Sequence, residues 1–189
     1  MEGNARRKGL RLLSAFLLTL AMTSGLFAYT YLVDTTTIVT AAASADFADV
    51  SENTSFDADY NLLGAVNGKI GSGIMFDVTG DNNYTGDVEI LVSLANADDM
   101  VDEYRFWMTR IELTDAATTT MVDKEGITKV ISLQNPSTSF VVDSDNITGK
   151  TAYVFLAGGS YKTFPHIQLG GNHDDPLFFC EVIQASTYQ

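Results

Sequence analysis

The side chains best suited to chemistry in this sequence are carboxylates, which gather in four short segments. Ca²⁺ prefers oxygen ligands from carboxylates, amides and carbonyls, so each segment is a candidate metal site. None follows the EF-hand loop, which needs a central glycine and a terminal bidentate glutamate at fixed spacing. Solvated loop carboxylates are the better explanation of any one segment, but the segments taken together with the net charge predict at least one calcium site. The four groups are Asp77, Asp81, Asn82 and Asp87; Asp98, Asp99, Asp102 and Glu103; Asp143, Asp145 and Asn146; and Asn172, Asp174 and Asp175.

Catalytic motifs are scarce, so we expect a protein that is not an enzyme. The chain has two histidines, His166 and His173, and no HExxH, GxSxG or phosphate-binding glycine loop. A zincin peptidase is therefore excluded. His173 stands beside Asp174 and Asp175, which leaves open a transition-metal site. A carboxylate pair for glycoside hydrolysis also stays open, because such pairs meet only in space.

The chain is strongly acidic. Its 189 residues include 24 acidic and 11 basic side chains, with a formal net charge of −13. Such a surface repels nucleic acid and anionic lipid, so we expect neither as a partner. It attracts divalent cations, although a simple contribution to solubility is the alternative interpretation.

The N-terminus has the pattern of a secretion signal over residues 1–28. Arg6, Arg7, Lys8 and Arg11 precede an apolar stretch that ends at Ala28. Cleavage there would remove four basic residues and one acidic residue, and so lower the net charge from −13 to −16. We therefore expect an extracellular or cell-surface protein with no membrane contact after cleavage. The alternative is an uncleaved anchor over residues 12–33, which is long enough to span a bilayer.

Cysteine and asparagine positions fit an exported chain. Cys180 is the only cysteine, so no intrachain disulfide can form, and we expect it to be a buried residue in a strand. An intermolecular disulfide is the alternative. Asn53, Asn83 and Asn146 each begin an N-glycosylation sequon.

Residues 29–45 predict a strand directly behind the signal. The segment is rich in Thr, Val, Ile and Tyr, and it has neither Pro nor Gly. Tyr31, Val33, Val39 and Ala41 would share one face. A terminal strand must pair with its own sheet or add to the edge of a neighbour's sheet. Tyr31, Val33, Ile38 and Val39 are our candidate assembly residues.

The rest of the chain, residues 46–189, predicts one all-β domain, a jelly-roll-like β-sandwich with one short helix. Residues 46–59 look like a linker. A helical turn over residues 96–104 would begin with Asn96 accepting from its first N–H groups. Core positions should include Val92, Leu94, Phe106, Trp107 and Ile111. Many short strands separated by turn residues favour such a sandwich. They are predicted at 60–66, 74–78, 87–95, 105–113, 118–122, 127–133, 139–142, 151–157, 167–169 and 177–185.

Two blocks resemble the cannula-forming proteins of hyperthermophilic archaea. One is VEILVSLANADDM followed by YRFWMTRIEL, within residues 87–113, and the other is KVISLQNPSTSFVVDSDNI, residues 129–147. The signal followed by an aromatic-led, Thr-rich strand is more distantly similar to bundling pilins and camelysin-like biofilm fibre proteins. The chain departs from the cannula pattern in being short between its last strands.

The resemblance implies a function as well as a fold. It implies a secreted archaeal jelly-roll subunit that forms extracellular tubes or filaments with Ca²⁺. It also implies that an N-terminal strand is donated to the next subunit, so that the partner is another copy of the chain in a homopolymer. The alternative hypothesis is a monomeric, calcium-dependent module that binds surface glycans.

Overall fold

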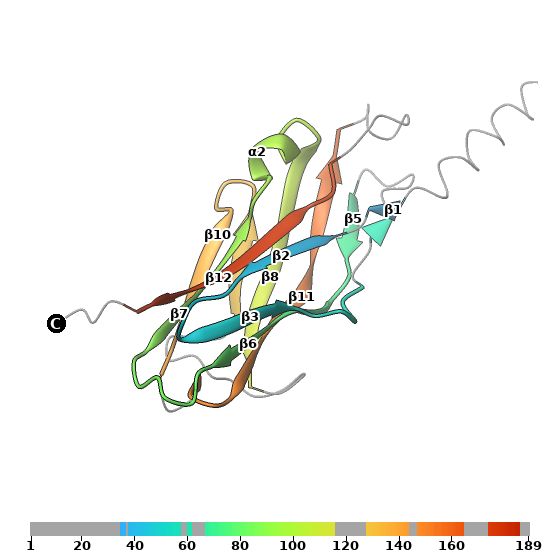
Figure 1. Ribbon diagram of the computed structural model, residues 1–189. Coiled ribbons are helices and arrows are strands. Elements are labelled where there is room, and N and C mark those ends of the chain that lie inside the picture. The colour runs from blue at the N-terminus through green and yellow to red at the C-terminus, as the bar shows by residue number, and fades with distance from the viewer. Residues whose placement is uncertain are drawn as a thin grey trace, which may run out of the picture. The chain divides into compact units, whose positions relative to one another are not determined.

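The computed structural model describes residues 35–36, 38–57, 60–61, 67–115, 128–143, 147–164 and 174–185. All of them belong to one compact unit, Thr35–Gln189. Its strands form two main sheets (Figure 1). The buried side chains of both sheets belong to one hydrophobic core. The structure also contains the short, four-residue helix α2 (Ala97–Met100). The predicted all-β sandwich with one short helix is therefore confirmed.

The first main sheet has four strands in the order β10-β7-β12-β2. These are β10 (Ser137–Val142), β7 (Val88–Leu94), β12 (Leu177–Gln184) and β2 (Val39–Ala43). In β7, buried Val88, Ile90, Val92 and Leu94 alternate with half-buried residues, which is the period expected when one face packs on a core. β10 and β12 pair with β7 in antiparallel fashion, whereas β2 runs parallel to β12.

The second main sheet follows the order β3-β6-β11-β8-β9. Its strands are β3 (Ala48–Glu52), β6 (Gly73–Gly80), β11 (Thr151–Thr163), β8 (Tyr104–Thr114) and β9 (Thr128–Ser132). A further strand, β5 (Asn67–Ile70), also pairs with β11. A separate two-stranded sheet joins β1 (Thr35–Thr36) to β4 (Tyr60–Asn61).

The strand order is that of a jelly roll. β2-β12-β7-β10 face β6-β11-β8-β9, and the chain passes from one sheet to the other between β7 and β8 and at each step from β9 to β12. Eight strands in two facing sheets with Greek-key connections define that architecture. β3 pairs with β6 at the end of the second sheet and is additional to these eight strands. The chain therefore reverses between β2, in the first sheet, and β3, in the second. The parallel direction of β2 is the departure from an all-antiparallel jelly roll.

The core lies between the two main sheets and is dominated by large side chains. Trp107 on β8 is 1% exposed, and its ring centroid lies 5.9 Å from that of Phe178 on β12. Val92, Leu94, Trp107 and Ile111 are buried as predicted. The prediction for Phe106 is wrong, because its side chain is 41% exposed. Side chains alternate across a strand, so Phe106 must point outward when its neighbour Trp107 points inward.

Residues 46–59 are not only a linker, because they contain β3. Ala48 and Val50 are buried, whereas Asp49 and Ser51 are exposed. β3 pairs with β6 and has no other partner strand in its sheet among the described residues. Asp49, one of the acidic residues that suggested a linker, lies on the exposed side of this edge strand, where charge is favourable.

Two other predicted segments differ in extent. Residues 29–45 contain β1 and β2, which pair with different strands, while residues 29–34 and 37 lie outside the described residues. The strand predicted to end at residue 157 continues to Thr163, because Gly158 has a φ of 83° and the register shifts between Leu156 and Gly159. A bulge therefore lies where the strand was predicted to end. The strands predicted at 118–122 and 167–169 fall outside the described residues.

Candidate functional site

The predicted assembly segment supplies the edge strand β2. Its five residues pair with Leu177–Glu181 of β12, with Ala42 opposite Cys180. The backbone N–H of Val39 donates to the carbonyl of Pro176 at 2.9 Å, just before β12 begins. The segment therefore completes the first sheet at one end of its strand order. Of the other candidate assembly residues, Tyr31 and Val33 lie outside the described part of the chain.

Backbone bonds and small side chains hold β2 in place. Ile38, just before the strand, is 5% exposed and belongs to the core, whereas Val39 is 41% exposed. Ala42 packs against the core and the remaining residues of β2 are half-buried. Full burial of one isoleucine is worth about 1.5–3 kcal/mol. The attachment of β2 therefore depends mainly on one apolar anchor and a parallel ladder.

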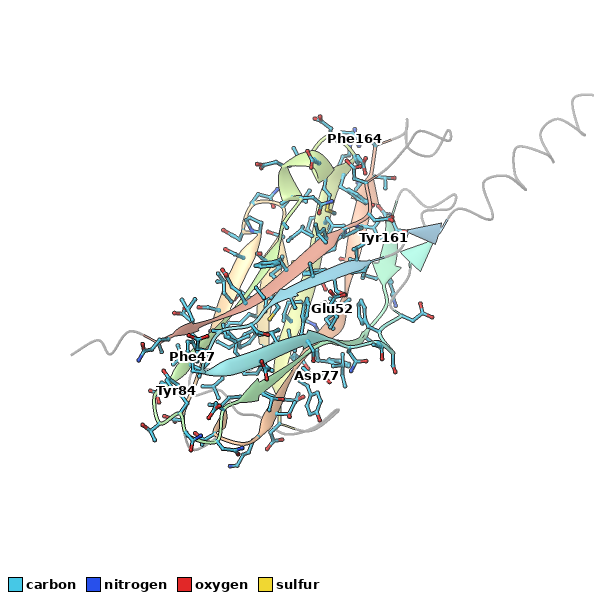
Figure 2. The ribbon with its side chains drawn as sticks, in the orientation of Figure 1. Phe47, Glu52, Asp77, Tyr84, Tyr161 and Phe164 are labelled. Carbon is cyan, nitrogen blue, oxygen red and sulfur yellow. The ribbon has the colours of Figure 1, made fainter. Side chains whose placement is uncertain are left out.

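A corner of side-chain bonds links β2 to β3. The N–H of Val50 donates to Ser44 Oγ at 2.9 Å, and Ala45 and Ala48 exchange backbone bonds at 2.9 and 3.2 Å. Glu52 of β3, labelled in Figure 2, accepts a hydrogen bond through Oε2 from Thr40 Oγ1 of β2 at 2.8 Å. This corner carries the chain from the first sheet to the second.

Cys180 is a buried free thiol, as predicted. It is 0% exposed on the inner face of β12. Burial, with a smaller contribution from the charge of Glu181, raises the pKa of its thiol to about 12. Since the thiolate is the reactive form, the folded protein holds Cys180 in an inert state.

The first acidic group is divided in the structure. Asp77 lies on β6 and accepts a hydrogen bond from Asn53 Nδ2 at 3.2 Å. Asp81 caps its own turn by accepting from the N–H of Asn83 at 2.7 Å. Asp87 comes after that loop, and its carbonyl accepts from Ala185 N–H at 3.1 Å and from the Tyr84 hydroxyl at 3.3 Å.

Asp81 and Asn82 line a hollow of about 200 Å³ with two carboxylates that the sequence did not single out, Asp46 and Asp49. The hollow lies at the β2–β3 corner, where Ala45 and Ala48 also line it. Asp46 and Asp49 were missed because their segment was interpreted as a linker. Alternation of Ala48 and Val50 with acidic or polar residues was the available signal.

The second and fourth acidic groups meet at one end of the sandwich. Glu103 Oε1 accepts from the N–H of Asp174 at 2.8 Å, and Asn96 Nδ2 donates to the carbonyl of Asp175 at 2.8 Å. Asn96 makes no side-chain cap bond to α2, so its predicted capping role is wrong. Its amide bonds the chain entering β12 instead. The exposed acidic residues of these groups include Asp98, Asp99, Asp174 and Asp175.

The remaining predicted sites are only partly described. The carbonyl of Asp143 accepts from Ile147 N–H at 3.2 Å, while Asp145, Asn146, Asn172 and both histidines lie outside the described residues. Among the sequons, Asn83 is exposed in a turn. Asn53 is half-buried, and its amide bonds both Asp77 and the N–H of Ser55. A glycan on Asn53 would disturb the bond to Asp77.

Within the described ranges, no three His, Cys, Asp or Glu side chains lie close enough together to hold a metal ion. Calcium also takes backbone carbonyls, amide oxygens and water, which that grouping does not include. The predicted calcium site therefore stays a prediction. None of the helices in the described part of the chain has the length and apolar character needed to cross a bilayer.

Comparison with known proteins leaves the chain without an assigned family. No protein-family model matches it, and no curated protein matches it significantly. The resemblance of the blocks at residues 87–113 and 129–147 to cannula-forming proteins therefore stays a hypothesis.

Proposed function

We propose that this protein is a secreted structural subunit that polymerises outside the cell into filaments or tubes. Each copy would donate its N-terminal segment, residues 29–45, to the sheet of the next copy and receive one in return. Ca²⁺ bound by the acidic loops would assist assembly. The supporting observation is that β2 pairs parallel to β12 at the end of the first sheet's strand order, through five residue pairs.

The main interactions of β2 would be the same whether the strand comes from the same copy or from another copy. The same segment of another copy would form the same ladder on β12, and its Ile38 would fill the same part of the core. Exchange costs the bonding at the β2–β3 corner, chiefly Ser44 with Val50, and the translational and rotational freedom that two copies lose when they associate. A donated strand creates a heterologous contact, which propagates into a fibre or tube unless the rotation closes.

A designed disulfide would test whether the strand is exchanged. Ala42 lies opposite Cys180 in the parallel pair, and both side chains face the core. Neighbouring strands are about 4.8 Å apart, which is within the Cα separation that a disulfide spans. Because Cys180 is the only native cysteine, Ala42→Cys allows one pair only. We expect oxidation during folding and assembly, before Cys180 is fully buried, to give a covalent ladder of multimers in non-reducing electrophoresis.

Ala43→Cys is the matched control. Residue 43 is opposite Glu181, one position along, so its side chain faces the other side of the sheet from Cys180. It should give no ladder. Deletion of residues 29–45 should abolish assembly and lower stability, because β12 would lose its parallel partner. An Ala42→Cys protein that forms only the disulfide within one chain, at every concentration, would contradict strand exchange and favour the monomeric glycan-binding module.

A further inference from the structure

The outer face of the four-stranded sheet is apolar and carries no positive charge. We call the outward side chains of β2, β12, β7 and β10 the β12 face. None of the four strands contains a Lys or Arg, and the charged side chains on this face are Glu89 and Glu181. Val39 is 41% exposed and Ile183 is 43% exposed. The other apolar residues of the face are half-buried: Ala41, Ala43, Leu91, Val141, Leu177 and Phe179.

The cross-strand pairing makes this face continuous. Phe179 lies between Ala41 and Ser93, and Glu181 lies between Ala43 and Leu91. Ile183 is opposite Glu89. Apolar side chains predominate on this face, and its polar residues are Glu89, Glu181 and the three serines Ser93, Ser137 and Ser139. Such apolar character is unusual on the solvent side of a sheet, where alternation normally places polar residues.

Part of the outer face of the second sheet carries positive charge. We call Lys69, Phe106, Met108, Arg110, Val130 and Lys162 the β8 face. Residues 29–189 contain seven basic residues, the 11 of the whole chain less the four before residue 12, and three of the seven lie here. Phe106 is 41% exposed and Val130 is 48% exposed.

Cross-strand pairing places the residues of the β8 face side by side. Lys162 is opposite Phe106, and Arg110 is opposite Val130. Ser160 lies between Lys69 and Met108. Glu112, two residues beyond Arg110 on β8, limits the basic region, and its carboxylate accepts from Thr128 at 3.4 Å.

The basic groups of the β8 face have no acidic partner in their own chain, as far as the structure describes it. Arg110 donates to the carbonyl of Ala157 at 3.1 Å, and no ion pair links Lys69, Arg110 or Lys162 to a described carboxylate. In a chain whose net charge is −13, three such groups beside exposed apolar side chains fit an acidic and apolar partner surface.

We propose that the β12 face of one copy stacks on the β8 face of a second copy. The contact would place Glu89 and Glu181 near Lys69, Arg110 and Lys162, and would cover the apolar side chains on both faces. Stacking two β12 faces would instead oppose carboxylates with carboxylates. The proposed contact joins two different surfaces, so it propagates like strand exchange. It rests on the proposed function only in having a second copy as partner.

The size of the face sets the strength of this contact. Four strands about 4.8 Å apart and about six residues long cover a projected area on the order of 400 Å². Stable interfaces bury roughly 800 Å² of accessible surface on each partner. Face stacking alone is therefore a weak contact, which strengthens the assembly when many copies repeat it.

The test uses an Ala42→Cys monomer in which oxidation has closed the disulfide to Cys180 within one chain. The lock prevents strand exchange, so any association must use other surfaces. The measurement is sedimentation velocity of concentrated protein at low and high ionic strength. We expect the locked protein to self-associate at low ionic strength and to dissociate as salt screens the charges.

Two charge reversals then assign the surfaces. Glu89→Lys with Glu181→Lys reverses the β12 face, and Lys69→Glu with Lys162→Glu reverses the β8 face. Each double variant should associate roughly tenfold more weakly than the locked parent, because like charges would meet. An equal mixture of the two variants should associate again, since each restores the complement of the other.

The control is Asp98→Lys with Asp99→Lys on α2, which changes the net charge as much as reversal of the β12 face does. Reduced overall repulsion favours association in both, so weakening in the Glu89 and Glu181 variant alone identifies a local contact. A locked parent that stays monomeric overturns the inference, as does unchanged association in either reversed variant or no rescue on mixing. None of these results alters the disulfide ladder that tests strand exchange.

Discussion

The side chain of Asn96 holds the backbone of Leu177, whose N–H donates to Asn96 Oδ1 at 2.9 Å. The same amide donates through Nδ2 to the carbonyl of Asp175 at 2.8 Å. One side chain thus ties the turn after β7 to the first residue of β12, the strand on which β2 docks. β2 therefore needs a correctly placed β12, whether it pairs with β12 of its own copy or of another copy.

Asn96→Ala should lower the free energy of unfolding. It removes two hydrogen bonds to backbone groups, one of them part-buried, and such losses cost about 1–3 kcal/mol. Urea unfolding followed by circular dichroism measures the change. Asp98→Ala is the control, because Asp98 is exposed in the same turn and its loss should change stability by less than about 0.5 kcal/mol. Equal effects of the two substitutions would refute the bridging role.

Neighbouring aromatic residues on β8 should respond in opposite ways to truncation. Trp107→Ala should cost about 3–5 kcal/mol, because it empties a large core position. Phe106→Ala should cost far less, since that side chain is 41% exposed. Trp107→Phe should be intermediate: it keeps an aromatic ring and removes an indole Nε1 that is buried without a hydrogen-bond partner among the described residues. Thermal or urea unfolding of the three variants decides the order.

Stability should fall above about pH 9 through Cys180. The pKa of its thiol is 9.0 in ordinary surroundings, and burial raises it to about 12 in the folded protein. The stabilising contribution is complete below pH 9.0 and is lost as the pH rises toward about 12, because the unfolded chain releases the proton first. The slope approaches about 1.4 kcal/mol per pH unit.

Cys180→Ala isolates this effect, because it removes the thiol and leaves the other titrating groups in place. The stability difference between parent and variant should shrink steadily with pH above 9.0. Native Cys180 should also resist alkylation by iodoacetamide until the protein is unfolded. Rapid alkylation of the native protein would show that the thiol is not held in the core.

Millimolar Ca²⁺ should raise the thermal midpoint of the protein or drive its association. A ligand that binds only the folded or assembled state must stabilise that state. The hollow lined by Asp46, Asp49, Asp81 and Asn82 is one place to test, and Asp49→Asn with Asp81→Asn should reduce the response if calcium binds there. Calorimetry and sedimentation at constant ionic strength are the measurements. No change in either over a calcium titration, with Mg²⁺ as the reference cation, would contradict the expectation.

Local pattern was enough to predict several elements. The alternation in Val88–Leu94 identified β7 and its buried face, because a strand beside a core must alternate. The apolar residues around Cys180 likewise indicated a buried strand. Both faces of β8 carry apolar residues, which is typical of a central strand, and β8 lies between β11 and β9. These inferences succeed because they depend only on neighbours in the chain.

Pairings between distant segments depended on the tertiary structure. Local pattern predicts neither the parallel match of β2 with β12 nor the hollow that Asp46 and Asp49 line together with Asp81, because each joins residues far apart in the chain. The opposite charges of the β12 and β8 faces have the same origin, since register alone brings Lys69 and Lys162 to one surface. Sequence determined which residues alternate between core and solvent, because that depends on side-chain chemistry and strand period. Only the fold decided which solvent-facing residues lie side by side, because strand order and register arise from packing across the whole core.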